Sequence, residues 1–192
     1  MNLIGLCGTI GVGKDTVASI LVQDYGFAKD SFASSLKDVI SVAFGWDREM
    51  MEGATPESRL WREQTDEWWS DRLGQTITPR KMLQLWGTDC IRTHFHDEFW
   101  LATVERRIRQ QILANPEAKI VLSDVRFPIE AECIRRLGGT IIKITRAKSQ
   151  DDIKNTTLHS SETSLQSIIP DKIITNDKSL DELKNTIQYL FE

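Results

Sequence analysis

The apolar positions of this 192-residue chain alternate between short continuous runs and periodic stripes. A continuous apolar or β-branched run predicts a buried strand, whereas apolar residues repeating every three or four positions predict a helix. The predicted strands cover residues 3–7, 27–32, 120–124, 140–145 and 172–175, with helical stripes between them. Strands that alternate with helices are typical of parallel sheets with right-handed crossovers. The pattern therefore predicts a three-layer α/β fold in which helices flank a five-stranded parallel sheet.

Several helix starts are marked by capping residues. Ser34 or Ser35 would cap the second helix, and Ser179 with Glu182 forms a capping box for the last one. The helix predicted over residues 97–114 has one apolar stripe at four-residue spacing, made of Trp100, Val104, Ile108 and Ile112. We expect this stripe to face a core.

Two stretches interrupt the alternation. Residues 46–95 begin with an irregular, charged segment rich in tryptophan and continue into a helical pattern, which predicts a helical insertion. Residues 146–170 are polar with little periodicity and form either a lid or a long surface loop; loops of this length are usually functional.

A chain of 192 residues is long enough for one well-buried domain and short for two, so we expect residues 1–192 to form a single domain.

Residues 8–14, between the first predicted strand and its helix, match the pattern GxxxxGK. Glycines let backbone N–H groups turn inward around an anion, the helix adds its positive N-terminal end, and Lys14 adds an ammonium group. The neighbouring strand and helix favour a phosphate-binding loop (P-loop) over a glycine-rich turn with an incidental lysine. One position departs from the general pattern, because Asp15 stands where Ser or Thr usually binds Mg²⁺, and Thr16 follows it.

The predicted strand over residues 120–124 ends in a carboxylate, Asp124. A strand buried on both faces that delivers an acid to the C-terminal edge of a parallel sheet is typical of nucleotide-binding sites. This position suits a Walker B aspartate.

The charge balance narrows the range of partners. A net charge of −4 and an isoelectric point near 5.5 provide no basic field for polymeric nucleic acid, so we expect no DNA or RNA partner. No apolar run is long enough to span a bilayer, and the chain begins at a strand without a basic and apolar leader. We therefore expect a cytoplasmic protein with no membrane partner.

The cysteines and histidines give weaker signals. Cys7, Cys90 and Cys133 have spacings typical of neither disulfide frameworks nor metal sites, which predicts buried thiols. His94 and His96 could suggest a metal pair, but no third ligand lies near them in the sequence, and this favours a surface turn.

Six strings occur in one order along the chain: LIGLCGTIGVGKDT, LQLWGTD, FW, SDVRFPIEAE, HSSE and IITNDKSLDEL. Their joint order resembles the phage-type deoxynucleoside monophosphate kinases, the family that includes the T-even phage enzyme. The resemblance covers both ends and most of the middle of the chain, and it fails mainly over residues 46–79. The family also has Asp after the P-loop lysine, so Asp15 supports the resemblance. A P-loop core with two insertions is the arrangement of nucleoside monophosphate kinases, in which the first insertion grips the acceptor and the second closes over ATP.

The resemblance implies transfer of the γ-phosphoryl group of ATP to the 5′-phosphate of a deoxynucleoside monophosphate, with the help of Mg²⁺. Lys14 and the backbone amides of the loop would bind the donor phosphates. The residues concerned are Gly11, Val12, Gly13, Lys14, Asp15 and Thr16. Asp124 would hold Mg²⁺, assisted by Asp15 or Thr16. The adenine would lie near Asn176 and Asp177, in the turn after the last strand. The resemblance also allows a homodimer, and the host cytoplasm as location if a phage encodes the protein.

Candidates for the acceptor and the transfer step come from three places. Arg126 is the first candidate for the acceptor phosphate, because a planar guanidinium matches it bidentately; surface pairing with Glu130 is the alternative. Arg146 opens the lid region and could swing onto the transferring phosphates or stay a solvated charge. The candidates for the acceptor base and sugar are Arg80, Gln84, Asp89 and Trp100, although core packing also fits Trp100. Three tryptophans could stack on a base or seal the insertion against the sheet: Trp61, Trp68 and Trp69.

Two alternatives stay open at this point. A dephospho-coenzyme A kinase or a phosphomevalonate kinase shares the P-loop and the lid. A nucleotide-binding switch or assembly ATPase would use the same loop without an acceptor. A panel of acceptors with ATP would separate the kinases, and ADP production only in the presence of a mononucleotide would favour a kinase over a switch or ATPase.

Overall fold

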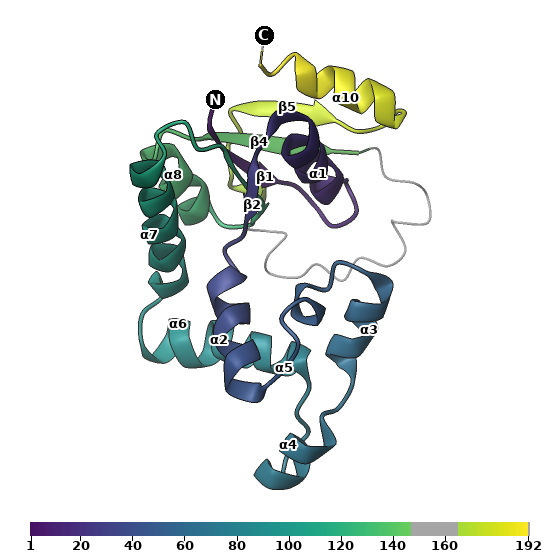
Figure 1. Ribbon diagram of the computed structural model, residues 1–192, viewed down its shortest axis with the longest axis vertical. Helices are drawn as coiled ribbons and strands as arrows, with labels where there is room; N and C mark the ends of the chain where they lie inside the picture. The colour runs from purple at the N-terminus through teal and green to yellow at the C-terminus, as the bar shows by residue number, and fades with distance from the viewer. Residues whose placement is uncertain (147–164, 192) are drawn as a thin grey trace. The chain divides into compact units, whose positions relative to one another are not determined.

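The computed structural model describes residues 1–146 and 165–191 of the chain. Five strands form one parallel sheet in the order β2-β3-β1-β4-β5 (Figure 1). Their bounds are β1 Leu3–Cys7, β2 Ala28–Asp30, β3 Ile120–Val125, β4 Thr140–Thr145 and β5 Lys172–Thr175. The predicted five-stranded parallel sheet is confirmed. Because β1 pairs with both β3 and β4, the loops that follow these three strands leave the sheet at the same edge.

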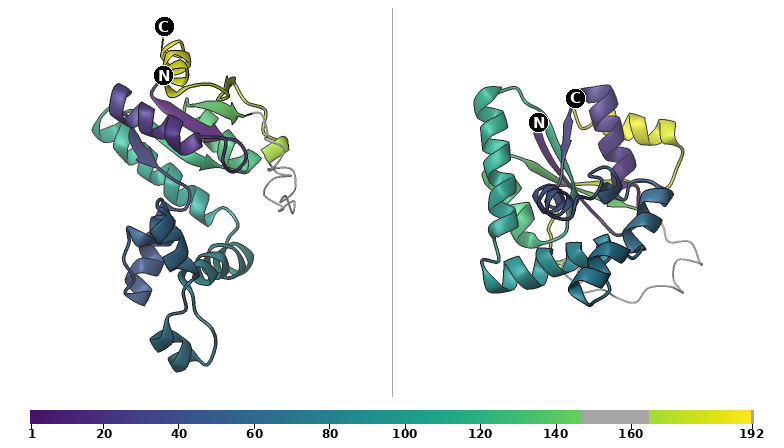
Figure 2. Two further views of the ribbon diagram at one scale, coloured as in Figure 1. Left: turned by 90° about the vertical axis from the view of Figure 1, so that its right-hand side faces the viewer. Right: turned by 60° about the horizontal axis from the view of Figure 1, so that its bottom comes forward.

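Both faces of β1 are buried, which explains its uninterrupted apolar run. Ile4 and Leu6 belong to a core that includes α1 (Lys14–Tyr25) and α10 (Leu180–Gln188). On the other face α8 (Pro128–Arg136) lies so close that a Cβ on Gly5 would be 2.6 Å from Cδ1 of Ile134. Helices therefore cover both faces of the sheet, as the views in Figure 1 and Figure 2 show.

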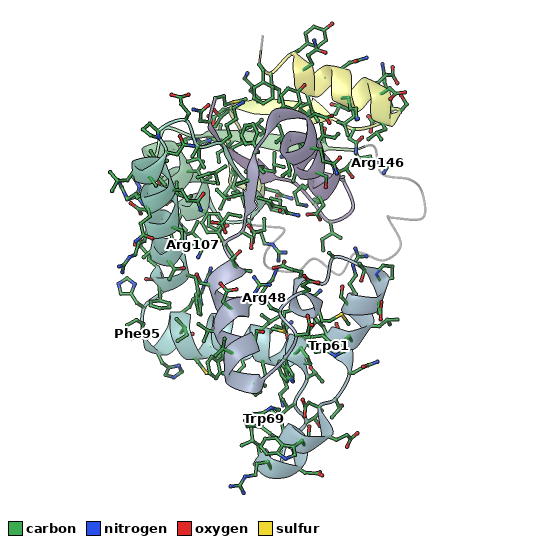
Figure 3. All side chains as sticks on the ribbon, viewed as in Figure 1. Arg48, Trp61, Trp69, Phe95, Arg107 and Arg146 are labelled. Atoms are coloured by element: carbon green, nitrogen blue, oxygen red, sulfur yellow. The ribbon has the colours of Figure 1, made fainter. Side chains whose placement is uncertain are left out.

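An ion pair attaches helix α7 (Phe99–Ala114) to the edge strand β2. Arg107, labelled in Figure 3, donates from Nη2 to Oδ1 of Asp30 at 2.8 Å and from Nε to Oδ2 at 3.1 Å. The Asp30 side chain is only 10% exposed, so the arginine compensates a carboxylate that has lost most of its water.

The insertion predicted over residues 46–95 is helical. The helices from residue 34 onward are α2 Ser34–Phe44, a short 3-10 helix Met50–Glu52, α3 Pro56–Glu63, α4 Glu67–Leu73, α5 Pro79–Gln84, a π-helical segment Leu85–Cys90 and α6 Ile91–His94. Thr55 and Asp66 cap α3 and α4 with their side chains. These caps explain why so charged a stretch forms regular helices.

An aromatic cluster forms the core of these helices. The rings of Phe44 and Trp46 are stacked with centroids 4.5 Å apart, and Trp69 donates from Nε1 to the carbonyl of Phe44 at 3.0 Å. Trp61 and Trp69, labelled in Figure 3, pack against this cluster, whereas Trp68 is 65% exposed. Two of the three tryptophans considered as a stacking platform thus pack in the core of these helices.

Contacts divide the chain into two compact units. Residues 1–32 and 105–192 form one, which we call the sheet unit, and residues 33–104 form the other, the helical unit. The predicted insertion lies inside the helical unit.

In the part of the chain that the structure describes, no helix has the length and apolar composition needed to cross a membrane.

Two local predictions are wrong. Helix α2 begins at Ser34, and Ala33 rather than a serine stands at the N-cap position (φ −85°, ψ −4°). Cys90 is exposed, whereas Cys7 and Cys133 are buried as expected. Cys90 ends the π-helical segment, and Thr88 and Asp89 before it are exposed as well.

Candidate functional site

The loop between β1 and α1 depends on glycine. Gly8 has φ 143°, and a Cβ there would lie 2.4 Å from the carbonyl oxygen of Ile144 in β4. Gly13, at the N-cap of α1, has φ 98°, a conformation that other residues rarely adopt. Val12 is 7% exposed and packs in the core, while Ile10 at the tip is 91% exposed. The loop is therefore fixed on one side and presents its backbone on the other.

Lys14 lies inside this loop. Its Nζ donates to the carbonyl oxygens of Gly8 at 2.8 Å and Thr9 at 2.7 Å. Burial and the positive charge of Arg126 lower the pKa of Lys14, and the negative charges of Asp15 and Asp124 oppose that shift. Lys14 and Asp15 begin α1, and Asp124 and Arg126 lie at the C-terminal end of β3, the strand that pairs with β1.

Oxygen ligands lie around the same loop. Asp124, the penultimate residue of β3, accepts a hydrogen bond at Oδ1 from the backbone N–H of Phe32 at 3.0 Å. Asp15 is exposed and its Oδ1 lies 2.9 Å from Nζ of Lys29, while Thr16 is exposed on the first turn of α1. Carboxylate and hydroxyl oxygens fit Mg²⁺, which proteins usually bind through one or two carboxylates together with substrate phosphates and water. Residues 1–146 and 165–191 contain no cluster of three or more His, Cys, Asp or Glu side chains that could hold a metal ion.

Arg126 follows β3 directly and is exposed. The carboxylate expected as its alternative partner, Glu130, is 4% exposed and accepts at Oε2 from the backbone N–H groups of Arg126 at 2.7 Å and Phe127 at 3.1 Å. Glu130 therefore fixes the backbone at the start of α8. The Arg126 side chain stays close enough to Lys14 for its charge to lower the pKa of that lysine.

The turn after β5 contacts the phosphate-binding loop. Asn176 donates from Nδ2 to the carbonyl oxygen of Val12 at 2.9 Å, and Asp177 is exposed.

Arg146, labelled in Figure 3, is exposed at the end of β4. The lid predicted over residues 146–170 lies mostly outside the described residues, because 147–164 are not among them.

The candidates for the acceptor base and sugar all lie in the helical unit. Arg80, Gln84 and Asp89 are exposed, and Nε of Arg80 lies 3.3 Å from Oε1 of Glu63. Trp100 is 4% exposed and donates from Nε1 to the carbonyl of Gly87 at 3.1 Å. This burial agrees with core packing, which the sequence allows as the alternative to base binding for Trp100.

Sequence reasoning missed Arg62. Its Nε is buried and has no hydrogen-bond partner among the residues that the structure describes. The guanidinium lies against the backbone of Gly53, where a Cβ would be 2.2 Å from Cζ of Arg62. Burial and the positive charge of Arg80 lower the pKa of Arg62; Glu63 opposes this and Arg59 adds to it. An arginine in a charged helix gives no signal in the sequence, because only the fold shows which of its nitrogens is buried without a hydrogen bond.

The sheet unit thus combines a backbone loop at a helix N-terminus with two cations and a strand-end carboxylate. N–H groups at the start of α1, which Gly13 cannot cap with a side chain, bind phosphate well. Such a site can bind a polyphosphate and stabilise the charge of a transferring phosphoryl group. The helical unit presents an arginine cluster, Arg59, Arg62 and Arg80, that suits a second anion.

Relatives match over nearly the whole chain. A family model described as deoxynucleotide monophosphate kinase matches residues 56–187. A relative from Acanthamoeba polyphaga mimivirus with the same activity in its name is 36% identical over 195 residues, covering 97% of this chain and 94% of the relative. The deoxynucleotide monophosphate kinase of Enterobacteria phage T4 is 24% identical, covering 99% of this chain and 100% of the relative.

Among solved structures, a sugar kinase from Janibacter sp. HTCC2649 is similar with a TM-score of 0.51. It is 12% identical, and the match covers 100% of this chain and 95% of that chain. At this identity the likeness concerns the fold alone. It agrees with a parallel sheet flanked by helices.

Proposed function

The chain belongs to the deoxynucleotide monophosphate kinase family, and we propose that it transfers the γ-phosphoryl group of ATP to the 5′-phosphate of a deoxynucleoside monophosphate. The products are ADP and the deoxynucleoside diphosphate. The observation that carries the proposal is the position of Lys14 Nζ, inside a glycine loop and near Arg126 and Asp124. Membership of this family also argues against the alternative functions, namely a dephospho-coenzyme A kinase, a phosphomevalonate kinase, and a nucleotide-binding switch or assembly ATPase.

The donor phosphates are proposed to bind the P-loop. Backbone N–H groups of residues 11–16 donate to the phosphate oxygens, and Lys14 exchanges its carbonyl partners for the β- and γ-phosphates. Phosphoryl transfer depends mainly on positioning the reactants and on neutralising the negative charge of the phosphate oxygens. The fixed N–H groups of the loop position the phosphates, and the mobile ammonium group of Lys14 neutralises part of their charge. The adenine is proposed to lie near Asn176 and Asp177, at the end of β5.

Mg²⁺ is proposed to bind Asp124, with Asp15 or Thr16 contributing a further oxygen directly or through water. When bound, Mg²⁺ neutralises charge on the phosphate oxygens during transfer. Asp15 can contribute after exchanging its exposed pairing with Lys29, since exposed ion pairs are weak.

The acceptor phosphate is proposed to bind Arg126. Its guanidinium group can donate two parallel hydrogen bonds to phosphate oxygens. In the helical unit, Arg62 has no hydrogen-bond partner at Nε among the described residues, and we propose that it contributes to acceptor binding there. Gln84, Asp89 and Arg80 are proposed for the base and sugar, and Arg146 for the transferring phosphates. Closure of residues 146–170 and a homodimer stay predictions of the family resemblance.

Product formation tests the proposal. ATP is incubated with Mg²⁺ and each deoxyribonucleoside or ribonucleoside monophosphate in turn, and ADP and diphosphate are quantified. We expect ADP to form in step with a deoxynucleoside diphosphate. ADP that forms equally well without any mononucleotide would sink the proposal in favour of an ATPase.

Lys14→Met is the matched variant for this assay. Loss of a donor that acts on the transferring phosphates costs about 2–4 kcal/mol of transition-state stabilisation, so turnover should fall at least about 30-fold. The variant should stay folded, because Lys14 bonds only to loop carbonyls among the described residues. Turnover near that of the wild type would contradict the assignment of Lys14.

A further inference from the structure

The residue that follows β5 joins two parts of the sheet unit that are far apart in the sequence. The backbone N–H of Asn176 donates to the carbonyl of Thr145 at 2.8 Å, which extends the pairing of β4 with β5. Its side-chain Nδ2 donates to the carbonyl of Val12 at 2.9 Å. The asparagine is thus fixed by its own backbone while its amide group holds the P-loop.

Gly13 accommodates this contact. A Cβ on Gly13 would lie 2.3 Å from Nδ2 of Asn176, so no other residue at position 13 leaves room for the amide. The carboxamide therefore packs directly against the backbone of the Val12–Gly13 peptide.

The direction of one hydrogen bond fixes the direction of another. The carbonyl of Val12 and the N–H of Gly13 belong to the same planar trans peptide unit and point in opposite directions. When Asn176 holds the carbonyl oxygen of Val12, the N–H of Gly13 must point away from Asn176. This N–H is one of the groups proposed to bind the donor phosphates.

We propose that Asn176 is a positioning residue for the P-loop: it holds the Val12–Gly13 peptide in the orientation that binds phosphate, and it does not select the adenine base. This inference rests on the proposed kinase function. It assigns Asn176 to the phosphate end of the nucleotide, whereas the family resemblance places it near the adenine.

Two variants and a ligand without a base separate these roles. In Asn176→Ala the hydrogen bond is lost, and in Asn176→Asp an oxygen faces the carbonyl oxygen of Val12. Loss of one such bond lowers affinity about 3- to 10-fold, and the aspartate should have the larger effect. We expect the dissociation constant of inorganic tripolyphosphate and the KM for ATP to rise by similar factors, while the acceptor KM and the ratio of kcat/KM for ATP and GTP stay constant.

Asn185→Ala is the control, since Asn185 is an exposed asparagine on α10, and its tripolyphosphate affinity should equal that of the wild type. Unchanged tripolyphosphate affinity in both Asn176 variants overturns the proposal, as does a changed ATP-to-GTP ratio, which would make Asn176 a base-contacting residue. Equal losses for donor and acceptor, together with a lower unfolding midpoint in both variants, would also overturn it, because the effect would then be general. Wild-type protein that makes no diphosphate would instead contradict the kinase function itself.

Discussion

At the residue scale, Arg126 tests how the acceptor phosphate is held. Its backbone is fixed by Glu130, so Arg126→Lys changes the head group without moving the chain. A lysine cannot reproduce two parallel hydrogen bonds, so kcat/KM for the mononucleotide should fall about 10- to 100-fold. Steady-state kinetics with each substrate varied should show a higher acceptor KM, a lower kcat and a nearly constant KM for ATP. A defect confined to ATP would move Arg126 to the donor site.

Arg62 gives a second residue-scale prediction, in which activity and stability separate. Arg62→Met removes a half-buried guanidinium group that lies against Gly53 and has no hydrogen-bond partner at Nε among the described residues. The acceptor KM should rise about tenfold, while the free energy of unfolding stays constant or increases, because a buried N–H group without a hydrogen bond is costly. The measurements are acceptor-dependent kinetics and urea unfolding.

Arg72→Met is the control for Arg62, since Arg72 is an exposed arginine on the neighbouring helix α4. It should leave both the acceptor KM and the unfolding curve unchanged. An Arg62 variant that loses stability and keeps its acceptor KM would show that Arg62 serves only the packing of α3.

At the element scale, a set of charges connects α2 to the 3-10 helix. Lys37 of α2 donates to Oε2 of Glu52 at 2.6 Å, and Arg48 donates to Oε1 of Glu52. Burial raises the pKa of Glu52, but the hydrogen bonds from Lys37 and Arg48 outweigh it, so the net pKa is lowered. The ionised carboxylate therefore stabilises this corner of the helical unit.

The sign of the pH dependence follows from this shift. A carboxyl group with a lowered pKa in the folded chain stabilises it above the ordinary value of 4.5, and this contribution is lost as the pH falls through the folded-state pKa. Between pH 7 and pH 3 the unfolding midpoint should therefore fall more for the wild type than for Glu52→Gln. All six tryptophans lie in residues 33–104, so tryptophan fluorescence reports on this unit.

Glu57→Gln, a change at an exposed carboxylate of α3, is the control for Glu52. Its midpoint should follow the wild-type curve over this pH range. Parallel curves for the wild type and Glu52→Gln would mean that the charge set around Glu52 contributes nothing to the pH dependence.

At the scale of the whole molecule, the sheet unit collects its site from the two distant parts of the sequence that form it. The P-loop follows β1 and Asp124 lies at the end of β3, whereas Arg126, Arg146 and Asn176 follow β3, β4 and β5 in turn. Parallel pairing of β1 with β3 and β4 places these strand ends at one edge, which is why ligands of such sheets bind there. The helical unit, residues 33–104, has an arginine cluster of its own.

The sequence by itself determined the parallel sheet, the phosphate-binding loop and the family. These rest on local signals: the apolar runs of β1 and β3, the GxxxxGK pattern with its glycines at positive φ, and motif strings in a fixed order. The limits of β4 and β5 and the capping box at Ser179 were predicted to the residue for the same reason.

Only the tertiary structure decided the partners of individual side chains. Asn176 and Val12 are 164 residues apart, and Arg107 and Asp30 are 77 apart, so no periodicity along the chain could pair them. The exposure of Cys90 and the missing Nε partner of Arg62 likewise depend on which neighbours the fold brings close. Local patterns specify elements because each element depends on nearby residues, whereas contacts between elements depend on how the sheet and helices pack.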